Sequence, residues 1–106
     1  MSKLVIYHRK ITLLTARAIV IKVEMSLVKF TSQVSTEFPE GYKFRWMAYN
    51  VDNPDKLLRF DNHTGKFPHW HDNGQEGELE WLGLEKTEQL FFQKVKSKFG
   101  YFDFDN

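Results

Sequence analysis

The residues best suited to chemistry lie close together in one segment of the chain. Three of the four histidines fall within nine positions of each other, and basic and acidic side chains flank them. The segment contains Arg59, Asp61, His63, Lys66, His69, His71 and Asp72. Histidine changes its charge close to neutral pH, so such a group beside cations and carboxylates can move protons. We therefore place the candidate chemistry of the chain in residues 59–72.

The spacing of the histidine pair predicts acid–base catalysis. Because His69 and His71 are two positions apart, an extended chain projects both imidazoles to one side, with about 7 Å between their Cα atoms. Such a pair can straddle a phosphodiester: one imidazole takes the proton of an attacking 2′-hydroxyl, and the other gives a proton to the leaving oxygen. Lys66 or Arg59 would stabilise the charge that grows on phosphorus, and Asp61 would orient one imidazole. These residues predict metal-independent cleavage of RNA, with no cofactor.

The same spacing also suits a divalent metal ion. Two imidazoles from one strand can chelate zinc or a similar ion, and His63 or Asp72 would then supply a third ligand. The alternative ligand set is therefore His63, His69 and His71. The neighbouring cations favour the acid–base interpretation, because they would repel a metal ion. A third interpretation has no catalysis: this loop and the aromatic C-terminal residues would together grip a partner.

Alternating side chains predict the strands that must hold this segment. Residues 18–30 alternate apolar and polar positions, which is typical of a half-buried strand. Residues 3–9 would pair with that strand through a turn at 14–17. Residues 42–49 alternate again, and residues 56–61 would return beside them after a turn rich in Asn, Asp and Pro.

The candidate segment itself shows neither period, so residues 62–77 are expected to form a long loop. Residues 78–82 alternate briefly and predict a last short strand. The period then changes to that of a helix over residues 84–99, with acidic residues early and lysines late, and Gly100 is placed to end it. Together these elements predict an α+β fold: an antiparallel sheet of four to five strands with one C-terminal helix packed on one face.

Composition restricts the class of protein. A chain of 106 residues with 42% hydrophobic side chains is expected to form one domain over residues 1–100, followed by a tail of alternating aromatic and acidic residues at 101–106. A net charge of +1 excludes a strong overall attraction to nucleic acid or membrane, so any anion site must be local. The absence of cysteine excludes disulfides, thiolate zinc sites and cysteine nucleophiles, and it suits the cytoplasm. The sequence shows no targeting segment and no stretch that would span a membrane.

The aromatic tail has two alternative roles. Tyr101, Phe102 and Phe104 would each cost about 1.5–3 kcal/mol to leave in water. They are expected to fold back on the sheet. The alternative is that they dock on another chain, which would make a homo-oligomer or a complex with a partner.

The motif around the histidines resembles the TumE-type toxin family of prokaryotic toxin–antitoxin pairs. The shared pattern is a strand that ends in Arg59-Phe60-Asp61-Asn62, followed by Gly65-Lys66 and then by His69-Trp70-His71. In that family a short Gly/Glu-rich loop, a strand and a helix rich in Leu and Phe follow, and residues 74–77, 79–82 and 85–95 match that order. Phe67 and Pro68 depart from the pattern, because the family often has Gly-Asp there, so one carboxylate is missing here.

The resemblance implies a small toxin that a partner neutralises, generally an antitoxin of helix-turn-helix type encoded beside it. It assigns no catalytic residues, so the acid–base roles above rest on residue types alone. The combined expectation is a cytoplasmic toxin that cleaves RNA, has a protein antitoxin as its partner and makes no contact with a membrane.

Overall fold

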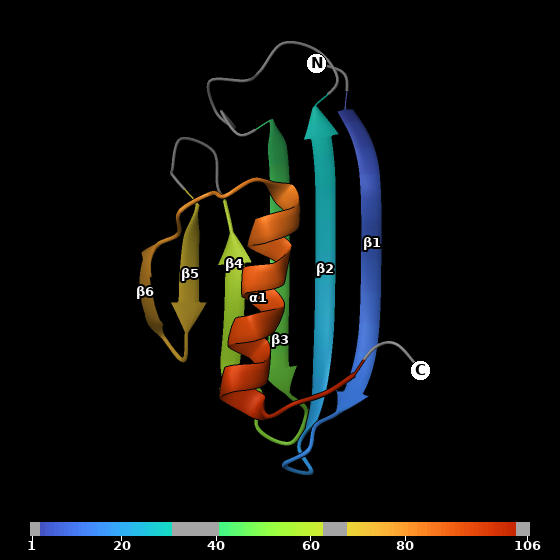
Figure 1. The fold of residues 1–106 in the computed structure, drawn as a ribbon, viewed down its shortest axis with the longest axis vertical. Coiled ribbons are helices and arrows are strands. Elements are labelled where there is room, and N and C mark those ends of the chain that lie inside the picture. Colours follow the sequence, from blue (N-terminus) through green and yellow to red (C-terminus); the bar gives the residue numbers. More distant parts are fainter. Residues whose placement is uncertain (1–2, 31–40, 63–67, 104–106) are drawn as a thin grey trace.

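Six antiparallel strands and one helix make up the described part of the chain. The computed structural model describes residues 3–30, 41–62 and 68–103. The strands lie side by side in chain order: β1 (Lys3–Leu14), β2 (Val20–Phe30), β3 (Tyr42–Asn50), β4 (Leu57–Asp61), β5 (His69–Asp72) and β6 (Gln75–Glu78). Helix α1 (Leu84–Phe99) packs on one face of this sheet (Figure 1), and no helix in the described residues has the length and apolar character to cross a membrane. The predicted α+β class is confirmed, with six strands in place of the predicted four to five.

The additional strands form a hairpin where the sequence predicts a loop. Strands β5 and β6 fall within residues 62–77, whereas residues 79–82 do not form the predicted last strand. Asn73 and Gly74 connect the two strands, both with positive φ (51° and 92°), which matches the twist that antiparallel strands prefer. The prediction of a loop is wrong because the four-residue strands β5 and β6 contain almost no β-branched or apolar side chains. Their sequence therefore shows no alternation.

The core lies between α1 and the sheet. Alternate residues of β2 and β3 face the helix, as the period of two predicts; the buried ones are Ile21, Val23, Met25, Leu27, Phe44, Trp46 and Ala48. The ring of Phe91 lies 5.3 Å from that of Phe60 and 5.9 Å from that of Trp46, measured between centroids. Val95 and Phe99 continue the buried stripe of the helix. The part of the sheet that α1 covers at β2 and β3 is therefore apolar.

The tail after α1 returns to the body of the protein. The helix ends at the predicted residue, and the Gly100 N–H donates a hydrogen bond to the Lys96 carbonyl. Phe102 is 3% exposed, and its ring centroid lies 6.4 Å from that of Phe92. The fold-back prediction is confirmed at Phe102, whereas Tyr101 is exposed and residues 104–106 lie outside the described residues.

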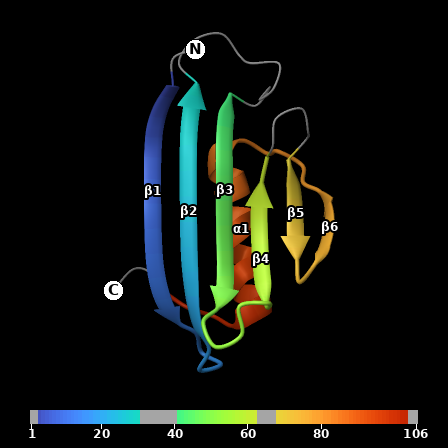
Figure 2. The ribbon, with the colours of Figure 1, turned by 180° about the vertical axis from the view of Figure 1, so that it is seen from behind.

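The opposite face of the sheet is not covered by any helix of the described residues (Figure 2). Its side chains alternate with those of the core; examples are Arg45 and Met47 on β3, and Arg59 and Asp61 on β4. We call this surface the open face. It contains the polar and charged residues of the central strands, so a functional site on the sheet is expected there.

Candidate functional site

His69 and His71 lie next to Asp61 and Arg59 on the open face. Strand β5 pairs with β4 so that His69 is opposite Asp61 and His71 is opposite Arg59. Phe60, between these two β4 residues, faces the core, so the register turns both imidazoles to the open face. The ring centroids are 4.7 Å apart and the ring planes meet at 69°. Both rings therefore share one side of the strand, as the spacing of two predicts.

The Asp61 carboxylate is the centre of this group. It is 2% exposed, and its Oδ1 lies 3.0 Å from His69 Nε2 and 3.8 Å from His71 Nε2. Its Oδ2 lies 2.9 Å from Arg59 Nε. A carboxylate that is this buried needs a compensating charge, and the Arg59 guanidinium supplies one. We call Arg59, Asp61, His69 and His71 the histidine centre.

Asn62 holds the end of β4 in place. Its side chain accepts a hydrogen bond of 2.9 Å from the Phe44 N–H and donates one of 2.8 Å to the Tyr42 carbonyl. Asn62 thus continues the pairing between β3 and β4 beyond the last residue of β4. Because Asp61 directly precedes Asn62, this clamp fixes the backbone that carries the central carboxylate. Asn62 belongs to the motif on which the predicted family resemblance depends, but its clamping role is visible only in the structure.

The surroundings of His71 favour its neutral form. Burial lowers the pKa of His71 below its ordinary value, and the positive charge of Arg59 lowers this pKa further, against the opposing effect of Asp61. His71 Nδ1 lies 3.3 Å from a carboxylate oxygen of Glu76, the residue opposite it on β6. A neutral imidazole can accept a proton or bind a metal ion. His71 is therefore suited to both of the chemistries that the sequence suggests.

Asp72 does not belong to the histidine centre. It faces the helix side, where its carboxylate forms an ion pair with Lys98 of α1. Its predicted use as a third metal ligand is wrong, because Asp72 directly follows His71 and neighbouring residues of a strand face opposite ways. Lys66 and His63, the other two candidates from this segment, lie outside the described residues.

Asp61 occupies the position of a third metal ligand instead. Its carboxylate and the Nε2 atoms of His69 and His71 offer ligand atoms that lie within 4.8 Å of one another. One carboxylate with two imidazoles is a donor set that zinc and iron accept. The Glu76 carboxylate beside His71 Nδ1 is also the kind of outer contact that orients a metal-bound imidazole. Arg59 opposes a cation at this site, because its positive charge lies beside the same carboxylate.

Glu76 lies beside the histidine centre, but the sequence prediction omits it. In a long loop Glu76 would have no fixed relation to His71, whereas the hairpin places the two residues opposite each other. The sequence signal that could have indicated this contact is the Asn73-Gly74 pair, because a two-residue turn at these positions fixes the register of the following strand.

Comparison of the chain with protein-family models, with curated proteins and with solved structures finds no match. The likeness to the TumE-type toxin family stays a prediction that depends on the motif from Arg59 to His71. The chemistry of the site must therefore be argued from the geometry of the histidine centre.

Proposed function

We propose that this chain cleaves RNA at the histidine centre without a metal ion, as the toxin of a toxin–antitoxin pair. One observation carries the proposal: two imidazoles share the open face beside a buried carboxylate and an arginine. Cleavage of a phosphodiester by general acid–base catalysis needs two groups that transfer protons and a cation that stabilises the transition state. The histidine centre offers all three within a few ångströms.

In this mechanism His71 acts as the base. Its lowered pKa keeps the imidazole unprotonated at neutral pH, so it can take the proton of the 2′-hydroxyl as that oxygen attacks phosphorus. The bond between phosphorus and the 5′-oxygen breaks, and His69 donates a proton to that oxygen, which leaves a 2′,3′-cyclic phosphate and a 5′-hydroxyl. Asp61 orients His69 through the 3.0 Å contact between Oδ1 and Nε2. Arg59, with Lys66 as the second cation of the motif, stabilises the charge on the phosphoryl oxygens.

An RNA cleavage assay in EDTA tests this mechanism. The chain should cut single-stranded RNA and leave 2′,3′-cyclic ends, and His69→Ala and His71→Ala should each lose more than about tenfold in rate, since each proton transfer contributes roughly 10²–10⁴. Asp72→Asn is the matched control, because Asp72 lies on the same strand but faces the helix. Wild-type protein that leaves RNA intact at every pH between about 5 and 8 contradicts the proposal.

A divalent-metal site is the second candidate function. The observation that favours it is the convergence of ligand atoms from Asp61, His69 and His71 within 4.8 Å, with Glu76 beside His71. Elemental analysis of the untagged chain separates the two candidates. Cleavage without stoichiometric metal supports the acid–base mechanism. Stoichiometric metal, lost together with cleavage when EDTA is added, replaces it.

The toxin assignment depends on the motif and implies a partner. A helix-turn-helix antitoxin encoded beside the gene would neutralise the chain in the cytoplasm, where cellular RNA is the substrate. Expression of the chain alone should arrest the growth of a bacterial host, and coexpression of the neighbouring reading frame should restore growth. Normal growth in the presence of folded, full-length chain contradicts the toxin role, while the RNA assay tests the chemistry separately.

A further inference from the structure

The sheet register aligns the histidine centre with a second polar group on the open face. His8, Ser26 and Arg45 occupy one row across β1, β2 and β3, and this row continues into Asp61 and His69. The next row consists of Lys10, Glu24, Met47, Arg59 and His71. Neighbouring strands are about 4.8 Å apart, so Ser26 and Asp61 are separated by about 10 Å along their row. Two adjacent rows thus connect β1 with the histidine centre.

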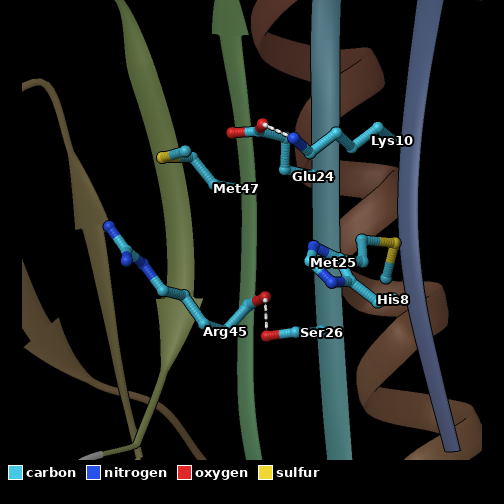
Figure 3. A pocket seen from close by; sticks show the side chains of 7 residues that line it. All are labelled: His8, Lys10, Glu24, Met25, Ser26, Arg45 and Met47. Atoms are coloured by element: carbon cyan, nitrogen blue, oxygen red, sulfur yellow. Dashed lines mark hydrogen bonds and ion pairs between the residues drawn. The ribbon is translucent and has the colours of Figure 1, made fainter.

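A pocket of about 350 Å³ opens where these rows cross the first three strands. It is lined by His8, Lys10, Glu24, Met25, Ser26, Arg45 and Met47 (Figure 3). This volume lies within the range of about 300–1,000 Å³ that is typical of small-ligand sites. The pocket and the histidine centre therefore lie on the same face, as neighbours along the same rows.

The charges that line the pocket favour an anion. Lys10 and Arg45 are cations, and His8 adds a ring that can donate hydrogen bonds. Glu24 is the one acid among the lining residues, and its Oε1 lies 3.9 Å from Lys10 Nζ, a long contact between side chains that are not buried. Such a contact contributes little to stability, so a ligand can displace it at low cost.

Arg45 links the pocket to the histidine centre. Its side chain extends from β3 toward β4, the strand of Arg59 and Asp61 (Figure 3). Among the residues that the structure describes, no ion pair engages the Arg45 guanidinium. An exposed arginine without a carboxylate partner is well suited to bind phosphate, because its planar donors match phosphate oxygens.

The remaining lining residues suit the other parts of a nucleotide. Met47 supplies a flexible, polarisable side chain that can adapt to the flat face of a base, whereas Met25 is 1% exposed and its side chain belongs to the core. The Ser26 hydroxyl lies between the basic side chains and donates a long hydrogen bond of 3.5 Å to the Arg45 carbonyl. Cations beside an apolar surface are the combination by which proteins hold single-stranded nucleic acid.

We propose that this pocket holds the nucleotide next to the scissile phosphate of a single-stranded RNA. The identity of the ligand rests on the proposed function, whereas the pocket and its charge follow from the register and the lining residues. The RNA strand crosses the open face along the two rows. Its reacting phosphate lies at the histidine centre, and the neighbouring nucleotide lies at Arg45.

Anisotropy of a fluorescently labelled single-stranded RNA, measured at several salt concentrations, tests this pocket. Arg45→Gln should weaken binding about fivefold to tenfold, because a charged contact to phosphate is lost. It should also make the slope of log K against log salt shallower by about 0.7, the value for one phosphate contact on a single strand. Lys10→Gln, from another strand of the same pocket, should act in the same direction.

Lys22→Gln is the matched control, because it removes one positive charge from the open face of β2 outside the pocket. It should change binding by less than about twofold, since salt screens charges that do not touch the RNA. Binding that depends on Arg45 without any cleavage supports the pocket and overturns the histidine mechanism. Cleavage whose KM is the same in Arg45→Gln and Lys22→Gln overturns the pocket and leaves the mechanism standing. Wild-type chain that binds no RNA at low salt also overturns the pocket.

Discussion

A single buried carboxylate organises the charged residues of the histidine centre. Arg59 approaches one oxygen of Asp61, and His69 and His71 approach the other. Neutralising Asp61 would leave the arginine without its counter-charge and the imidazoles without the acceptor that orients them. Asp61 therefore has a structural role and, in the proposed mechanism, also a functional one, and measurements of stability and of activity can separate the two.

Asp61→Asn should destabilise the folded chain and slow RNA cleavage. Removing one partner of a buried ion pair costs about 3–5 kcal/mol, and we expect a loss near the lower end because Arg59 retains some contact with solvent. Asp72→Asn breaks the ion pair with Lys98, whose acid is 44% exposed, and should cost less than about 1 kcal/mol. Unfolding in urea measures both values. Equal losses in the two variants would contradict the central role of Asp61.

The pH dependence of cleavage should report the protonation of His71. Because burial and Arg59 lower the pKa of His71, the base stays unprotonated in mildly acidic solution, and the acidic limb of kcat/KM, where protonation of His71 slows cleavage, should lie below about pH 6.5. Glu76→Gln should lower this pKa further, since the Glu76 carboxylate favours the imidazolium form. An NMR titration of the His71 ring measures the shift directly, with Glu80→Gln as the control on an exposed acid. A pKa of His71 that rises in Glu76→Gln would contradict the assigned environment.

The sequence predicts the central strands and the helix but not the hairpin that contains the histidines. Strands β2 and β3 alternate because one of their faces is buried under α1, and that burial requires apolar residues at every second position. In the hairpin, Trp70 is the one large apolar residue, and Gly77 lies against its indole, where a Cβ would come within 2.6 Å of Cζ2. The space that a second apolar side chain would need is filled by Trp70, so the strands show no alternation.

The sequence also predicts only a part of the candidate site. The pairing of His69 with His71 is predictable, because a spacing of two places both on one side of any strand. The contacts with Glu76 and the row that leads to His8 and Arg45 depend on the register between separate strands. For the contact with Glu76, the local pattern that indicates this register is the Asn73-Gly74 turn.

Gly74→Ala should affect cleavage more than an equally strained substitution elsewhere. Gly74 has a φ of 92°, and a side chain in this region costs about 1–2 kcal/mol. Gly41→Ala is the matched control, since Gly41 has a φ of 83° and an added Cβ would meet no atom within 4 Å at either glycine. Because the turn sets the register between His71 and Glu76, only Gly74→Ala should lower the cleavage rate beyond its effect on urea unfolding. Equal cleavage in the two variants would show that this turn does not position the site.

The two faces of the sheet have different surroundings. Helix α1 and the tail complete the core on one side, and the open face presents the histidine centre and the pocket. The tail and the last turn of α1 are joined to the turn between β1 and β2, because the Ala16 N–H donates to the Tyr101 carbonyl at 2.7 Å and Arg17 donates to the Lys98 carbonyl at 3.2 Å. A ligand on the open face would therefore contact a sheet whose opposite face is packed against both the helix and the tail.

Phe102→Ala should test whether the tail belongs to the core. Phe102 is almost fully buried against Phe92, so its truncation should lower the free energy of unfolding by about 3 kcal/mol. Tyr101→Ala is the neighbouring control: Tyr101 is 61% exposed, and the loss of its ring should cost less than about 1 kcal/mol. Urea unfolding measures both variants, and light scattering should show that neither changes the oligomeric state. If Tyr101→Ala were the more disruptive variant and dissociated an oligomer, the tail would be a docking surface and not a part of the core.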